Sequence, residues 1–80
     1  MILEVGNAML AYLMNTAREY TRKSDGGESL ESLKQWAQNK ITARPDLFHS
    51  YESNVLPLAA NHLLLFCMGE PSQFDKVINP

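Results

Sequence analysis

One stretch constrains the fold of this 80-residue chain more than any other: residues 55–68, VLPLAANHLLLFCM, closed by Gly69. Eleven of its fourteen residues are apolar. A helix of this length would be about 21 Å long, which crosses a small domain but not the hydrocarbon core of a bilayer. We therefore expect this stretch to form a central buried helix that the rest of the chain covers.

The length and composition predict a single helical domain over residues 1–80. Apolar residues make up 45% of the chain, a normal fraction for a globular protein. Eighty residues lie near the lower limit for a self-sufficient core. The single cysteine excludes an internal disulfide. Association with another chain is then the expected source of extra stability.

Hydrophobic periodicity predicts an all-α fold, a small compact bundle in an orthogonal or up-down arrangement. In the first helix, apolar residues recur at steps of three and four. Gly26 and Gly27 then form a turn, Ser29 is placed to cap the second helix, and Pro45 ends it. We expect four to five helices, at about residues 2–23, 29–43, 46–53, 54–68 and 72–78.

The region around Pro57 allows two predictions. Asp46 could cap one short helix and Asn54 the next, with Pro57 in the first turn, where its missing N–H does little harm. Alternatively, residues 46–68 form one continuous helix that is kinked at Pro57. We favour two separate helices, the second ending with Gly69 at its C′ position.

The residue types that carry chemistry are few, and their spacing favours no catalytic, cofactor or metal site. His49 and Glu52 share a helical face, but no second pair completes a zinc site. Cys67 is expected on the buried side of its helix, where thiols are inert. Phosphate and calcium loops are absent. A small enzyme or metal protein using His49, Glu52, His62 and Cys67 is therefore our last-ranked hypothesis.

The charge pattern gives one alternative function, a small DNA-binding transcriptional regulator. The chain carries a net charge of −2 and has a pI of about 5.5, whereas a polyanion binder should be basic. Basic residues nevertheless exceed acidic ones between residues 18 and 44. We favour solubilising charges, and the residues that would contact nucleic acid in the alternative are Arg18, Arg22, Lys34, Lys40 and Arg44.

The central stretch contains more apolar residues than one buried helical face needs. Leu58 and Leu65 lie on the same side as Asn54, Asn61 and His62. Each leucine left in water would forgo roughly 1.5–3 kcal/mol of burial. Another segment of the chain or a second chain must cover this side, and we favour a two-fold homodimer. The candidate partner-binding residues are Tyr12, Trp36, Leu58, His62 and Leu65.

These patterns predict a non-enzymatic interaction or regulatory protein that acts through a helical surface. Its partners are expected to be itself, as a homodimer, and another protein that it regulates or inhibits. Its size and lack of catalytic motifs are typical of bacterial or phage accessory proteins. The first residues, MILEVGNAML, do not resemble a signal peptide, and a lone thiol suits a reducing cytoplasm.

Overall fold

The computed structural model describes residues 2–48 and 54–78, and every regular element in them is a helix. The elements are α1 (Ile2–Asp25), α2 (Leu30–Thr42), α3 (Leu56–Cys67) and α4 (Asp75–Ile78). The predicted all-α class is confirmed. The predicted number of four to five helices is not matched, because the described residues form three extended helices and only a single turn at α4.

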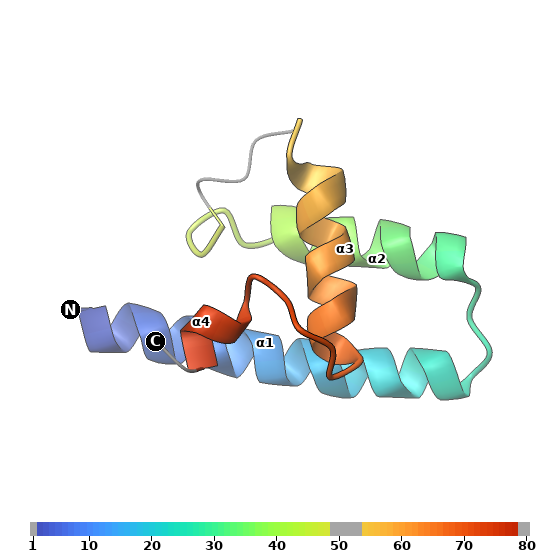
Figure 1. Ribbon diagram of the computed structural model, residues 1–80, viewed down its shortest axis with the longest axis horizontal. Helices are drawn as coiled ribbons and strands as arrows, with labels where there is room; N and C mark the ends of the chain where they lie inside the picture. The colour runs from blue at the N-terminus through green and yellow to red at the C-terminus, as the bar shows by residue number, and fades with distance from the viewer. Residues whose placement is uncertain (1, 49–53, 79–80) are drawn as a thin grey trace.

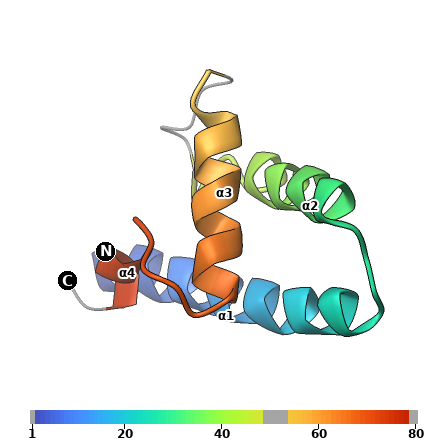
Figure 2. The same cartoon turned by 45° about the vertical axis from the view of Figure 1, so that its right-hand side comes forward.

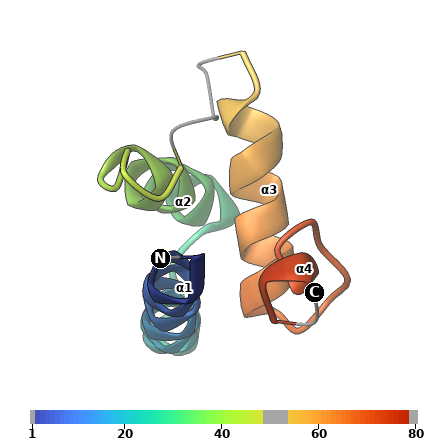
Figure 3. The ribbon, with the colours of Figure 1, turned by 90° about the vertical axis from the view of Figure 1, so that its left-hand side faces the viewer.

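Helix α3 lies across a pair formed by the other two long helices. α2 runs back beside α1 in the opposite direction, and α3 crosses both (Figure 1). The same crossing is visible after rotation (Figure 2). Seen along α1, one side of α3 faces the α1–α2 pair and the other side faces away from it (Figure 3). The principal extents of the chain are 39 × 25 × 20 Å.

The ends of α1 and α2 follow local rules that are readable in the sequence. Gly27 adopts a φ of 80°, and the Glu28 N–H donates to the Lys23 carbonyl at 3.2 Å, which closes α1 with a left-handed cap. This cap carries α1 to Asp25, two residues beyond the predicted end. Ser29 caps α2 as predicted, because its hydroxyl accepts from the Ser32 N–H at 3.2 Å.

The predicted helix at 46–53 is wrong where the structure describes it. Residues 45–48 form turns, in which the N–H groups of Leu47 and Phe48 both donate to the Arg44 carbonyl at 3.0 Å. Asp46 does not cap a helix, because its carboxylate accepts two hydrogen bonds from the Arg44 guanidinium at 2.8 and 2.9 Å. The remainder of the predicted helix, residues 49–53, lies outside the described residues.

The start of α3 corrects one prediction and supports two others. Val55 occupies the N-cap position and makes no side-chain capping bond, so the prediction that Asn54 caps this helix is wrong. Pro57 lies in the first turn as predicted. Asn54 and Val55 form a turn, which excludes a continuous helix over 46–68.

The predicted cap at the other end of α3 is confirmed. Gly69 has a φ of 79°. The Glu70 N–H donates to the Leu65 carbonyl at 2.9 Å, and the Gly69 N–H donates to the Phe66 carbonyl at 3.1 Å. These two bonds satisfy carbonyls that the helix end would otherwise leave without a partner.

The last helix is shorter than the predicted 72–78 because Ser72 and Asp75 hold each other at its start. The Ser72 N–H and hydroxyl both donate to the Asp75 carboxylate, at 3.1 and 3.4 Å. The Phe74 N–H donates to the Ser72 hydroxyl at 3.2 Å. This capping turn directs Phe74 into the core, where its ring meets Phe48 edge-on at 6.1 Å.

The buried core collects beneath α3. The small residues Ala37, Ala59 and Ala60 are fully buried, and small side chains let crossing helices approach closely. Phe48 and Phe74 close the core from the two connecting segments. The buried apolar residues are Leu13, Leu33, Ala37, Ile41, Phe48, Ala59, Ala60, Leu63, Leu64 and Phe74.

Candidate interaction surface

Glu19 is the polar centre of the α1–α2 junction. Its carboxylate accepts a hydrogen bond from the Trp36 indole N–H at 2.7 Å and another from the Lys40 ammonium at 3.1 Å. The Trp36 N–H, and after it Lys40, hold the pKa of the Glu19 carboxyl below its ordinary value of 4.5, although partial burial opposes them. Trp36 therefore ties two helices together with its only polar atom.

Tyr12 makes a second tie between the same elements. Its hydroxyl donates to the Lys40 carbonyl at 2.6 Å. The Lys40 ammonium lies 5.0 Å from the centre of the Tyr12 ring, and the Arg44 guanidinium lies 5.1 Å from it. The Phe48 ring packs against its edge at 6.0 Å. Of the candidate partner-binding residues, Tyr12 and Trp36 are thus half-buried contacts within the chain, and their role toward a partner stays a prediction.

The other candidates, Leu58, His62 and Leu65, lie on α3, on positions other than the buried Ala59, Ala60, Leu63 and Leu64. Leu58 exposes 59% of its surface and Met68 exposes 48%. Asn61 is exposed and Leu65 is partly exposed. Successive steps of three, four and three residues place these four on one stripe of the helix. We name Leu58, Asn61, Leu65 and Met68 the outer face of α3.

The C-terminal segment runs beside the outer face and covers its edge at His62. The Gln73 N–H donates to the His62 Nδ1 at 3.1 Å, and the Glu70 N–H donates to the Leu65 carbonyl. His62 is half-buried as a result. The sequence left open whether this side is covered by the same chain or by a second chain. The same chain leaves His62 and Leu65 only partly exposed, whereas Leu58 is exposed.

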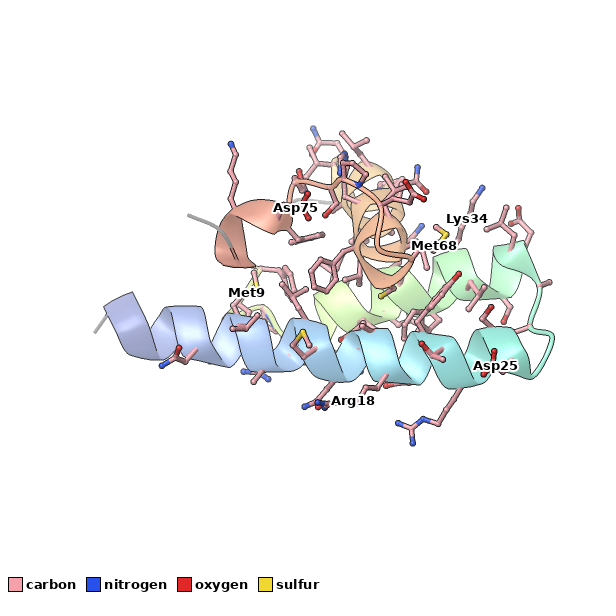
Figure 4. The ribbon with its side chains drawn as sticks, turned by 60° about the horizontal axis from the view of Figure 1, so that its bottom comes forward. Met9, Arg18, Asp25, Lys34, Met68 and Asp75 are labelled. Atoms are coloured by element: carbon pink, nitrogen blue, oxygen red, sulfur yellow. The ribbon has the colours of Figure 1, made fainter. Side chains whose placement is uncertain are left out.

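The five basic residues of the DNA-binding alternative do not gather on one face. Arg18 projects from α1 on the side opposite to Lys34 of α2 (Figure 4). Arg22 is exposed one helical turn beyond Arg18. Lys40 pairs with Glu19, and the Arg44 guanidinium is held by Asp46. A phosphate-binding surface needs unpaired cations gathered together, so this arrangement favours the alternative less than the sequence does.

His62 and Cys67 are the histidine and the cysteine among the residues that the structure describes. No group of three or more His, Cys, Asp or Glu side chains there could hold a metal ion. Burial, and the charge of Glu19 after it, raise the pKa of the Cys67 thiol to about 12. Cys67 therefore stays protonated near neutral pH and is a poor nucleophile. His49 and Glu52 lie outside the described residues.

Comparison with known proteins adds no constraint on function. No protein-family model matches the chain, and no curated protein or solved structure is similar enough to it to count as a match. Within the described residues, no helix combines the length and apolar character that crossing a membrane requires.

Three features of the structure were not among the candidate residues predicted from the sequence. Asn61 was placed on the same side as Leu58 and Leu65 but, like Met68, was not named as a partner-binding candidate, although the spacing of both is visible in the sequence. Glu19 joins Trp36 across seventeen positions, a partner that no local pattern indicates. Thr16 is buried, and its hydroxyl is satisfied within its own helix because it donates to the Tyr12 carbonyl at 2.7 Å.

Proposed function

We propose that the protein is a non-enzymatic interaction module that regulates or inhibits a partner protein through the outer face of α3. The observation that carries this proposal is the exposure of Leu58 at 59% on the most apolar helix of the chain. Single exposed leucines are common on protein surfaces. Here, however, Leu58 is followed on the same stripe by Leu65, which is partly exposed, and by Met68, so that a second protein could contact three apolar side chains around Asn61.

The arrangement of charge supports this proposal over nucleic-acid binding. No Asp, Glu, Lys or Arg occurs in α3 between Leu56 and Cys67. Charged residues are depleted in the centres of protein–protein interfaces, where methionine is enriched. The basic residues lie elsewhere, and two of them are paired with carboxylates. As part of the proposal we assign the protein to the cytoplasm, because a lone cysteine suits a reducing compartment.

Cross-linking from a defined position tests the proposed surface. A photoreactive phenylalanine derivative at position 58 is expected to capture a specific protein in cells of the source organism. The same group at Gln35, an exposed position on α2, is expected to capture none. The captured protein, once purified, should bind the wild-type chain and lose at least about tenfold in affinity for Leu58→Glu.

Circular dichroism of Leu58→Glu serves as the control for folding. Equal capture from positions 58 and 35 would overturn the proposed surface. So would a captured protein that binds a folded Leu58→Glu variant as tightly as it binds the wild type.

A further inference from the structure

We infer that the hydrogen bond from the Gln73 N–H to His62 Nδ1 is a pH-sensitive latch. It holds residues 71–73 against α3 while His62 is neutral, and it releases them when His62 takes up a proton. The latch lies within one chain, so the inference does not depend on the proposed function. Three observations carry it: the ring atom that accepts the bond, the charged groups around α3, and the fixed points on either side of Gln73.

The latch joins the C-terminal segment to the middle of α3. After Gly69 the chain turns back along this helix before it reaches α4 (Figures 1 and 3). The Gln73 N–H then donates to His62 Nδ1 at 3.1 Å, across eleven positions of the sequence. The returning segment is therefore tied to the helix beyond the hydrogen bonds that close its end.

The accepting atom makes this bond depend on the protonation of His62. In a neutral imidazole one nitrogen accepts and the other carries the hydrogen, so the ring that accepts at Nδ1 is protonated at Nε2. A proton from solvent binds the same Nδ1 lone pair that the Gln73 N–H uses. Both nitrogens are then donors, and no rotation of the ring offers an acceptor. Histidine ordinarily makes this change between about pH 5 and 8, so the bond is present at the upper end of that range and lost toward the lower end.

The charged groups around α3 do not replace the lost bond. α3 carries no charged side chain, and Cys67, its other titratable residue, stays protonated near neutral pH. In the described part of the chain, none of the ion pairs includes His62. Lys40 pairs with Glu19, and the Asp75 carboxylate accepts from Ser72. The described charged side chains that are half-buried in α1 or α2, or that lie on the C-terminal segment, are Glu19, Lys23, Lys34, Lys40, Glu70, Asp75 and Lys76.

Fixed points on either side of Gln73 limit how far the segment can move. The Glu70 N–H is held by the Leu65 carbonyl, and the Phe74 ring is 2% exposed against Phe48. Burial of an aromatic ring stabilises a fold more than one hydrogen bond near the surface does. Loss of the latch therefore loosens residues 71–73 between these points and leaves Phe74 in the core.

Release changes the exposure of His62, one of the candidate partner-binding residues. The ring is half-buried while the C-terminal segment lies against it. Once residues 71–73 move away, the protonated ring presents two N–H donors and a positive charge to its surroundings. The latch thus adds a pH-dependent group to the edge of an otherwise uncharged helix.

NMR of the nitrogen-15-labelled full chain, titrated between about pH 5 and 8, tests the latch. At the upper end, a scalar coupling through the hydrogen bond should join the Gln73 amide nitrogen to His62 Nδ1. The coupling should disappear as the ring takes up its proton. Exchange of the Gln73 amide with water, corrected for its intrinsic pH dependence, should become at least about threefold faster.

The Phe74 amide is the internal reference for this titration, because it donates to the Ser72 hydroxyl within its own turn. Its corrected exchange should not change. A coupling that survives protonation would overturn the inference. So would a ring that stays neutral throughout, or equal acceleration at Gln73 and Phe74.

Two substitutions at position 62 separate the proton from the acceptor. An asparagine Oδ1 takes the place of Nδ1 and accepts at any pH, so His62→Asn should keep the Gln73 amide protected throughout. His62→Phe keeps a ring without an acceptor and should show fast exchange at every pH. His49→Gln removes the other histidine of the chain and should respond to pH like the wild type.

Circular dichroism confirms that each variant is folded, and the titration of the wild type stands without them. A folded His62→Asn variant whose Gln73 amide loosens in acid as much as in the wild type would place the pH response at another group. That result would overturn the latch.

Discussion

The junction between α1 and α2 and the junction between α2 and α3 are built from different kinds of contact. α1 and α2 meet through polar and aromatic side chains, in which Glu19 and Tyr12 of α1 bond to Trp36 and Lys40 of α2. α2 and α3 contribute fully buried apolar residues to one core cluster, Ala37 from α2 and Ala59, Ala60 and Leu63 from α3. The first junction therefore depends on hydrogen bonds and an ion pair, and the second depends on close packing of apolar side chains.

Because of this difference, we expect the loss of a contact to destabilise the fold less at the first junction than at the second. Each polar contact between α1 and α2 is partly exposed, so water can replace part of what its loss removes. The buried side of α3 is apolar, so water does not replace a packing contact that is lost there, and the resulting cavity stays empty. The same apolar character of α3 also leaves Leu58 in water on its other side. One uncharged helix therefore supplies both the core and the candidate binding surface.

The largest expected effect comes from truncating the inner side of α3. Leu63→Ala should lower the free energy of unfolding by about 2–5 kcal/mol, because Leu63 is fully buried and its removal leaves a cavity. The matched change on the other side, Leu58→Ala, should stay within about 0.5 kcal/mol. Urea denaturation followed by circular dichroism at low protein concentration measures both. Similar losses for the two variants would refute the separation into an inner and an outer side.

The separation of these two sides follows from helical angles, so the sequence alone could predict it. The same is true of Ser29 and Gly69, where a cap depends on residues within one turn. Asp46 was harder to predict because two local outcomes competed for its carboxylate, a helix cap and a bond to Arg44 two residues earlier. In the structure the carboxylate bonds to Arg44, and residues 45–48 form turns.

The candidate surface was predictable only in part for a similar reason. Leu58 and Leu65 could be assigned to one side because their relation lies within one helix. Trp36 and Tyr12 look equally available in the sequence, but their polar atoms bond to Glu19 and Lys40 across 17 and 28 positions. Such pairings depend on how α1 and α2 lie against each other, which periodicity does not specify.

A smaller effect is expected at the polar junction. Trp36→Phe keeps an aromatic ring beside Tyr20 but removes the N–H that donates to Glu19. We expect a loss of about 1 kcal/mol, below the usual range for bonds to charged groups, because Glu19 is partly exposed. A double-mutant cycle with Glu19→Ala, which removes the accepting oxygens, measures the coupling. A coupling near zero would mean that the bond does not hold the two helices together.

The smallest expected effect is a dependence of stability on acid pH that traces to Glu19. The Trp36 N–H and Lys40 hold the pKa of the Glu19 carboxyl in the folded chain below 4.5, its ordinary value. The unfolded chain therefore takes up the proton first as the pH falls. Stability from this group is complete above about pH 4.5 and is lost as the pH falls through the lower, folded value.

Unfolding measured from about pH 7 to about pH 3 should therefore show a smaller acid loss in Glu19→Gln than in the wild type. Asp46, whose pKa Arg44 also lowers, should keep part of the loss in both proteins. Glu31→Gln removes an exposed carboxylate from α2 and should reproduce the wild-type curve. If Glu19→Gln and Glu31→Gln behave alike, the polar junction does not depend on the ionised form of Glu19. The charge of Glu19 would then not contribute to the difference between the α1–α2 and the α2–α3 junctions.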